Sequence, residues 1–322
     1  MEIVVFLYET ILKHNKVKIV LFLIDLLSRC SWSSLYRFSD FSAFVLFRIF
    51  GYRKAVINKN LTKSFPNKSR EEIREIKYRF YTHFTDLIVE TIKLSKCSAE
   101  EVLERLIMSE ESERHFKELK KGAVVLLGHR GNWELANLYI SLRNFIEPVV
   151  VYKPLADAGF ESWFRRLRTR FGSTMSPMKQ VYEELEKERE KPYAVYLVND
   201  QSPNPKTAYW TQFLNQDTGV FRGAEVISRK YMTSVFFADV RPIAGKRGYY
   251  EVEVKLFTED PTDLPRNAIL ESQIRYLERN IKAQPHNWLW SHKRWKHQKP
   301  EKLNEEQLPE ILEGWEKRKQ NF

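Results

Sequence analysis

Shortages of cysteine, of long apolar runs and of nucleophile motifs exclude several classes of protein. The 322 residues include two cysteines, Cys30 and Cys97, too few for a disulfide framework or a four-ligand zinc site. No uninterrupted apolar run approaches the roughly 20 residues that a membrane-spanning helix needs. The sequence contains no G-x-S-x-G elbow and no H-E-x-x-H pair. We therefore expect no serine nucleophile, no metal site and no cofactor.

Positive charge is in excess. The chain has 53 Lys and Arg against 42 Asp and Glu, a net charge of +11 at pH 7. Such an excess favours anionic partners, such as nucleic acid, anionic lipid or a phosphorylated substrate. Aromatic residues make up 14% of the chain, and many stand beside basic residues. That mixture suits both a membrane interface and a nucleic-acid surface, so composition alone does not choose between them.

Residues 1–51 are richer in apolar and aromatic side chains than the rest of the chain. Asp25 interrupts the apolar stretch and Ser28-Arg29-Cys30 is no small-residue cleavage site, which disfavours a signal peptide. We expect one or two amphipathic helices lying in a membrane interface, with Trp32 and Tyr36 at headgroup depth. The alternative is an ordinary helical hairpin packed on the core.

Residues 52–121 are expected to form a helical region that packs on the core. Ser69-x-x-Glu72 and Ser98-x-x-Glu101 are capping-box patterns, and each opens a helix. From residue 122 to about residue 300, short apolar runs alternate with helical patterns, which predicts an α/β domain with a mostly parallel central sheet flanked by helices. Residues 301–322 form a charged tail. The expected strands are 123–128, 147–152, 193–198, 234–240 and 249–257, and the expected helices are 133–143, 160–170, 178–190, 223–231 and 265–283.

The stretch from Ala123 to Glu134 carries the strongest signal for a site. Its buried strand ends at a glycine-flanked His129, and Asn132 is placed to cap the helix that follows. Open α/β sheets bind their ligands at the carboxyl ends of strands. Glu134 falls in the first helical turn, from where its carboxylate can fix the imidazole tautomer of His129. The alternative is a structural histidine that is merely satisfied by Glu134.

The chemistry that remains is base catalysis without a nucleophile from the protein. Neither cysteine is near His129 in sequence, and the glycines at 128 and 131 do not form a phosphate-binding loop. A His–Glu pair can instead deprotonate a substrate hydroxyl, whose oxygen then attacks an activated acyl carbonyl directly. The positive charge and the N-terminal segment point to a lipid substrate that bears anionic groups.

These residues resemble a known family. H-R-G-N-W-E resembles the H-x4-D/E motif of glycerolipid acyltransferases, and more closely that of the bacterial lipid A biosynthesis (late) acyltransferases. The resemblance extends from about residue 20 to residue 297 and rests on an ordered set of motifs. The further segments similar to this family are Asn60–Pro66, Tyr152–Pro154, Arg165–Gly172, Asn199–Gln201, Thr218–Glu225 and Trp288–Lys296.

The resemblance implies the partners and the site. The donor would be an acyl carrier protein or coenzyme A thioester, and the acceptor a hydroxyl of a membrane lipid on the cytoplasmic face of the bacterial inner membrane. His129 would be the general base, Glu134 its partner, and Asp200 would line the site. Arg168 and Arg170 would bind a phosphate of donor or acceptor, and Asn132 joins them in the expected substrate-binding set.

Two departures from the family pattern leave the acceptor open. Lys153 replaces the usual arginine in Y-R-P and so loses a bidentate donor, and Gln201 stands where some lipid A enzymes carry histidine. The acceptor is therefore a lipid A precursor, or alternatively another glycolipid, aminolipid or lysophospholipid. A nucleic-acid-binding protein would have no use for the apolar N-terminal segment and shows no standard motif. An inert lipid-binding scaffold is the other rival.

Overall fold

The computed structural model describes residues 17–307 and shows an α/β fold around one seven-stranded sheet. The strand order is β1-β9-β8-β2-β5-β3-β4, with every neighbouring pair parallel except β8 and β9. Strands β6 and β7 form a separate antiparallel hairpin. The mostly parallel sheet expected from the alternating pattern is therefore confirmed. The strands are β1 (Leu106–Met108), β2 (Ala123–Leu127), β3 (Glu147–Tyr152), β4 (Thr174–Pro177), β5 (Tyr193–Val198), β6 (Tyr209–Phe213), β7 (Gln216–Val220), β8 (Ser234–Pro242) and β9 (Tyr250–Thr258).

The centre of the sheet is apolar because β2 is covered on both faces. All five β2 residues are buried, and β2 lies between β5 and β8. A strand covered on both faces reads as a continuous apolar run, which is why residues 123–128 were recognisable in the sequence. In β5 only Ala194 and Val195 are buried, and β9 alternates apolar and charged residues as a strand with one exposed face does.

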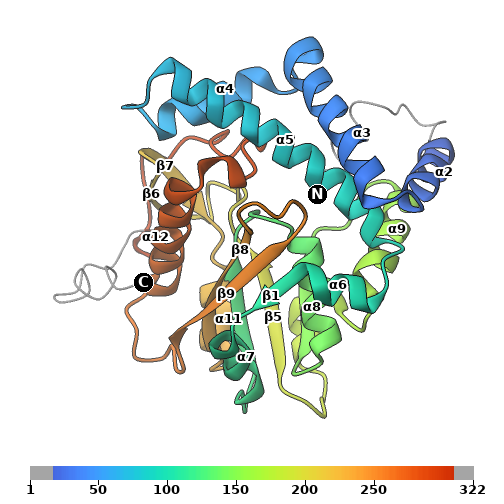
Figure 1. Ribbon diagram of the computed structural model, residues 1–322. Helices are drawn as coiled ribbons and strands as arrows, with labels where there is room; N and C mark the ends of the chain where they lie inside the picture. Colours follow the sequence, from blue (N-terminus) through green and yellow to red (C-terminus); the bar gives the residue numbers. More distant parts are fainter. Residues whose placement is uncertain (1–16, 308–322) are drawn as a thin grey trace.

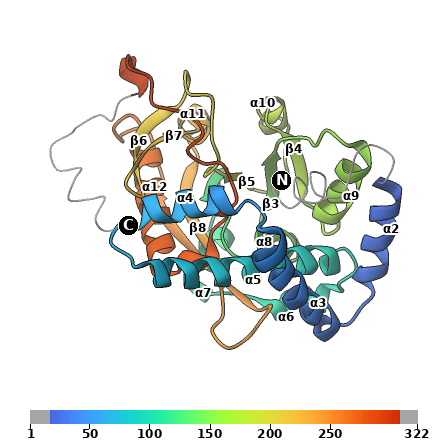
Figure 2. The ribbon, with the colours of Figure 1, turned by 90° about the horizontal axis from the view of Figure 1, so that it is seen from above.

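Helices pack on both faces of the sheet (Figures 1 and 2). Helices α8 and α9 contact β3 and β4 respectively, while α11 and α12 contact each other and the strands β2 and β8. The long helix α5 (Arg70–Leu94) crosses one end of the sheet in Figure 1. These helices and the short ones around them are α6 (Ala99–Arg105), α7 (Glu110–Lys117), α8 (Trp133–Arg143), α9 (Ala158–Thr169), α10 (Val181–Leu185), α11 (Gly223–Lys230), α12 (Ala268–Ala283), and the 3-10 turns η2 (Pro285–Asn287) and η3 (Glu305–Gln307).

The N-terminal helices pack on α5 and leave apolar side chains exposed. Both α2 and α3 contact α5, and Figure 2 shows them along one flank of the molecule. Within residues 17–307, no helix is long and apolar enough to cross a membrane. The helices are α2 (Val17–Ser28), α3 (Trp32–Phe44), the π-helical turn η1 (Val45–Phe50), α4 (Lys54–Ser64) and α5 (Arg70–Leu94). The exposed apolar side chains on α2, α3 and η1 are Ile19, Phe22, Leu23, Leu26, Phe38, Phe41, Phe44, Ile49 and Phe50.

Both predicted capping boxes are confirmed. Ser69 accepts a hydrogen bond from the Glu72 N–H, and the Glu72 carboxylate accepts one from the Ser69 N–H. Ser98 and Glu101 repeat the arrangement at the start of α6. These reciprocal bonds satisfy donors that a helix start otherwise leaves unpaired.

Several elements differ from the sequence-based expectation. The region 52–121 is not wholly helical, because β1 extends the sheet beside β9. The expected helix 178–190 is shorter, Val181–Leu185, and β4 and the β6–β7 hairpin were not expected. Strands of three or four residues are too short to show a period. The hairpin turn, Leu214–Asn215, has positive φ at both residues but lacks the glycine that normally marks such turns. Residues 1–16 of the predicted membrane segment, and residues 308–322 of the tail, lie outside the described residues.

Candidate active site

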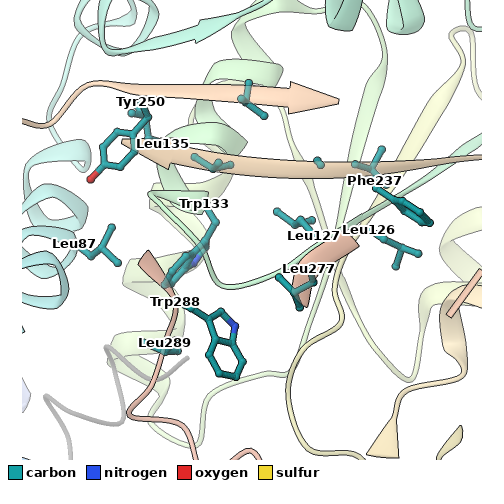
Figure 3. Packing of buried hydrophobic residues seen from close by; sticks show 14 of the residues in the cluster. Leu87, Leu126, Leu127, Trp133, Leu135, Phe237, Tyr250, Leu277, Trp288 and Leu289 are labelled. Atoms are coloured by element: carbon teal, nitrogen blue, oxygen red, sulfur yellow. The ribbon is translucent and has the colours of Figure 1, made fainter. Parts of the chain in front are cut away.

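His129 lies two residues beyond the end of β2, in a loop that its neighbours hold tightly. The Gly131 N–H donates to Asn287 Oδ1 at 2.8 Å. Gly131 has φ +54°, and a Cβ there would come within 2.5 Å of the Val240 carbonyl oxygen, so only glycine fits. Leu127, Trp133, Trp288 and Leu277 belong to the buried core around this end of β2 (Figure 3). The position of His129 is therefore fixed by packing on several sides.

The carboxylate beside His129 is that of Asp200. Asp200 Oδ1 lies 2.5 Å from His129 Nδ1, and Asp200 Oδ2 accepts a hydrogen bond from the His129 backbone N–H at 2.7 Å. Strand register explains the contact. Leu127 of β2 pairs with Val198 of β5, so the residues two positions beyond each strand, His129 and Asp200, are neighbours. Both side chains are buried, with exposed fractions of 8% and 2%.

Asp200 is held in its ionised form. Burial alone would raise its pKa, but the adjacent His129 and the hydrogen bonds from His129 and from Trp288 Nε1, at 2.7 Å, hold the pKa of Asp200 well below its usual range. An ionised carboxylate can only accept, so the Nδ1–H of His129 donates to it. The other ring nitrogen, Nε2, is then free to take a proton, and it lies 3.3 Å from the Gln201 side-chain amide.

Glu134 does not make the hydrogen bond to His129 that its spacing suggested. Its two carboxylate oxygens accept from Arg168 of α9, at 2.8 Å from Nε and 2.5 Å from Nη2. Burial raises the pKa of Glu134, and the Arg168 guanidinium outweighs this and lowers it. The Trp133 ring instead lies edge-on against the His129 ring, with centroids 5.0 Å apart. The expected His129–Glu134 pair is thus corrected to a His129–Asp200 pair.

The two arginines expected to bind phosphate have protein partners. Arg168 is bound by Glu134, as described above. Arg170 donates to the backbone carbonyl oxygens of Leu94 and Cys97, and so ties the end of α9 to the end of α5. Two nitrogens of each guanidinium are therefore occupied by protein oxygens, and Arg168 also lines the cavity described below. The charge of the arginine-rich segment is visible in the sequence, whereas the carboxylate and the carbonyl oxygens that it contacts are distant in sequence.

Asn132 is the helix cap that was predicted, but it does not line the cavity. Its Oδ1 accepts from the Leu135 N–H at 2.9 Å, and its Nδ2 donates to Glu90 Oε2 of α5 at 2.8 Å. Only 2% of Asn132 is exposed. It therefore holds the start of α8 and the loop before it, and the expected direct contact with substrate is not supported.

A cavity of about 1010 Å³ opens beside His129. Its interior lies between the sheet and the helices α7, α8 and α9, and it is lined mainly by apolar side chains. Basic and amide side chains also line it, and among them Lys153, Lys179 and Lys296 are exposed. The apolar lining includes Phe116, Val125, Leu127, Ala136, Ile140, Phe164, Ala238, Val240, Val252 and Val254. In the described part of the chain, no three His, Cys, Asp or Glu side chains gather to hold a metal ion.

The sequence indicated Asp200 as a residue of the site. It did not indicate that Asp200 bonds to His129 or that Trp288 donates to Asp200. One signal was present. The expected strands 123–128 and 193–198 are each followed closely by a polar residue, and neighbouring parallel strands bring such residues together. Nothing in the sequence showed that these two strands are neighbours, because 71 positions separate His129 from Asp200.

The fold and the site define a class of protein: an α/β enzyme in which a histidine, hydrogen-bonded to an ionised carboxylate, lines an apolar cavity. Comparison with known families makes this specific. The family model described as bacterial lipid A biosynthesis acyltransferase matches residues 10–297. The chain belongs to this family and is an acyltransferase of the lipid A type. A search of curated proteins finds no match.

Proposed function

We propose that this enzyme transfers a fatty acyl chain from an acyl thioester, carried by acyl carrier protein or coenzyme A, to a hydroxyl of a lipid A precursor. The observation that carries the proposal is His129, held by the ionised Asp200 and turned toward an apolar cavity of about 1010 Å³. Such a cavity suits a long acyl chain. Another glycolipid or lysophospholipid as acceptor would use the same chemistry.

Each side chain at the cavity has a role in the proposed reaction. His129 Nε2 takes the proton of the acceptor hydroxyl, whose oxygen attacks the thioester carbonyl carbon. The tetrahedral oxyanion collapses as the carbon–sulfur bond breaks, and the imidazolium returns its proton to the departing thiolate. Asp200 stabilises the imidazolium, and the Gln201 amide beside Nε2 can donate to the oxyanion. No covalent bond to the protein forms.

Glu134 acts through Arg168 in this proposal rather than through His129. Both side chains line the cavity, and their ion pair joins the first turn of α8 to α9. The pair is buried, so loss of either partner would leave an unpaired charge beside the substrate. This gives the acidic residue of the H-x4-E motif a role in shaping the cavity wall.

The apolar interior is the proposed binding place of the donor's acyl chain. Val125 lies four positions before His129 and lines the cavity, so the cavity extends about 13 Å along the strand at a rise of about 3.3 Å per residue. Phe116 of α7, which is 1% exposed, lines the same region. A chain that enters beside His129 would therefore run along the sheet toward Phe116.

Lysines in the cavity lining are the proposed phosphate contacts, in place of the arginines first expected. Lys153, Lys179 and Lys296 line the cavity and are exposed. Within residues 17–307 the lysines that form ion pairs with carboxylates are others. These three lysines are therefore available to the phosphate of a donor or of an acceptor, each as a point charge rather than as a bidentate fork.

The exposed apolar side chains of α2, α3 and η1 are the proposed membrane-docking surface. Phe22, Phe41 and Phe50 have exposed fractions of 68%, 64% and 75%. Exposed Lys18, Arg37 and Arg48 stand on the same elements. Apolar side chains interspersed with basic ones suit an anionic bilayer surface, into which such helices bury their apolar face. We place the enzyme on the cytoplasmic face of the inner membrane, on its surface or with a short N-terminal anchor.

Lipid mass spectrometry of cells with and without the gene tests the acceptor. The proposal predicts that lipid A from cells without the gene lacks one acyl chain, and that a plasmid-borne wild-type copy restores it. An unchanged lipid A together with an altered second lipid class would reject lipid A as the acceptor and keep the acyl transfer.

A further inference from the structure

Glu90 is a buried carboxylate that the proposed reaction does not use, and it lies behind the catalytic loop. It is on α5, only 2% exposed. Three donors from three different elements converge on it. Tyr36 Oη of α3 donates to Oε1 at 3.0 Å, while Asn132 Nδ2 and Tyr250 Oη of β9 donate to Oε2 at 2.8 Å and 2.7 Å. Such a fully bonded group in the interior constrains every element that reaches it.

The bond to Asn132 connects Glu90 to the site. Asn132 stands three residues after His129, and its Oδ1 caps α8 through the Leu135 N–H at 2.9 Å. With its Nδ2 bound to Glu90, the amide of Asn132 cannot turn over, so the cap stays in place. The first residue of α8 is Trp133, whose ring meets His129. Glu90 thereby fixes the loop that carries the base.

The bond to Tyr36 connects Glu90 to the exposed helix α3. On the same helix, the Ser39 hydroxyl donates to Asp86 of α5 at 2.6 Å, and Arg247 pairs with both Asp86 and Asp40. Helix α3 is thus bound to α5 by the buried Ser39–Asp86 bond and to the β8–β9 turn by the exposed Asp40–Arg247 pair. Figure 3 shows Tyr250 with its hydroxyl turned toward the side on which Leu87 of α5 lies, one turn of helix before Glu90.

We infer that Glu90 is a positioning residue: through Tyr36–Glu90–Asn132 it holds the catalytic loop in register with α3. The inference rests on the proposed function, because it gives α3, the proposed docking helix, a direct hydrogen-bonded connection to the loop of His129. Burial and the nearby Asp86 raise the pKa of Glu90 to about 7, and its three donors act in the opposite direction. Around it, Tyr36, Asp86 and Tyr250 are the titratable groups that face it from α3, α5 and β9, and Arg105 faces Tyr36.

Four variants separate positioning from general stability. Glu90→Leu removes both acceptor oxygens and with them all three hydrogen bonds. Glu90→Gln keeps one oxygen for Asn132 and Tyr250, while its NH2 can donate to the Tyr36 hydroxyl, so it should preserve the loop. Tyr36→Phe removes only the outer connection. Tyr249→Phe is the matched control, because it removes a similar hydroxyl-to-carboxylate bond, to Glu104 at 2.9 Å, on the surface.

The first measurement is steady-state acyl transfer from dodecanoyl-acyl carrier protein to a lipid A precursor in anionic vesicles. We expect kcat to fall at least about tenfold in Glu90→Leu with KM within about twofold, an interaction worth about 1.4 kcal/mol in the transition state. Glu90→Gln should recover most of kcat, Tyr36→Phe should be intermediate, and Tyr249→Phe unchanged. An unchanged kcat in Glu90→Leu would overturn the inference.

The second measurement needs no substrate. Hydrogen exchange should show the Leu135 amide opening at least about tenfold faster in Glu90→Leu and faster in Tyr36→Phe, with the amides of β2 unaffected. A uniform rise in exchange over all elements would mean general destabilisation and would contradict positioning. If the wild-type protein transfers no acyl chain, the proposed function fails, while this exchange pattern still decides the role of Glu90.

Discussion

At the scale of single residues, the contacts of the two acids near His129 determine what each acid can do in the proposed reaction. The Asp200 carboxylate is hydrogen-bonded to the ring and to the backbone N–H of His129, and it also accepts a hydrogen bond from Trp288 Nε1. Glu134 bonds Arg168 instead. In the proposed reaction the two acids therefore have different roles: Asp200 fixes the tautomer of His129 and stabilises its imidazolium, whereas Glu134 shapes the cavity wall.

The Asp200→Asn variant tests this assignment. An amide in place of the carboxylate can still bond Nδ1 but cannot stabilise the imidazolium, so we expect kcat to fall by about 100-fold or more. Asp217→Asn, the same replacement at an exposed carboxylate of β7 that accepts from Gln212, is the matched control. Circular dichroism monitors folding in both. Near-normal kcat in a folded Asp200→Asn protein would show that Asp200 is not the partner of the base.

The sequence located His129, Asn132 as a cap and Asp200 at a strand end, and these residues are where it placed them. It assigned the wrong acid to His129 because a spacing of five residues is visible along the chain, whereas strand order is not. The protein partners of the two arginines were missed for the same reason. Their charge is local information, but the Glu134 and backbone oxygens that occupy them belong to the tertiary structure.

At the scale of elements, a continuous apolar run predicted β2 because it is buried on both faces, and alternation of apolar and charged residues predicted β9. The short edge strands β1 and β4 escaped, since their pairing with β9 and β3 stabilises them more than their own sequence does. This matters for the site, because β1 and α7 supply Met108 and Phe116 to the cavity lining. The depth of the cavity therefore depends on β1 and α7, and the short strand β1 could not be predicted from its sequence.

Phe116 at the α7 side of the cavity should limit the acyl chain. We expect Phe116→Ala to shift the preferred donor toward chains about two or more carbons longer, because removal of the ring extends the cavity. The same change costs about 3–5 kcal/mol of stability. Phe257→Ala, which deletes a buried ring that does not line the cavity, is the control for that cost. Competition among acyl thioesters of different length measures the preference, and an unaltered preference in both variants would contradict the placement of the chain.

At the scale of the whole molecule, the exposed apolar flank and the active-site cavity belong to one connected structure. Helices α2 and α3 pack on α5, which also carries Glu90 and reaches the catalytic loop. An enzyme whose acceptor is a membrane lipid needs its cavity held at the bilayer surface. The packing of α3 on α5 provides a fixed relation between the two.

Introducing negative charge on α3 tests whether the proposed docking surface binds membranes. The double variant Phe41→Asp and Phe44→Asp should weaken sedimentation with anionic vesicles by about tenfold or more, because burying one phenylalanine contributes about 1.5–3 kcal/mol. Val226→Asp, at a residue 42% exposed on α11, is the control and should bind as the wild type does. Equal binding by all three proteins would place the membrane contact elsewhere.

The central claim is that His129 is the base of an acyl transfer to a lipid hydroxyl. Its most direct test is the rate of dodecanoyl transfer to a lipid A precursor in vesicles by His129→Ala, compared with the wild type and with His297→Ala, a substitution at an exposed histidine. We expect a loss of about 100-fold or more in His129→Ala alone, with folding and vesicle binding unchanged. Transfer by His129→Ala at a near-normal rate would contradict it.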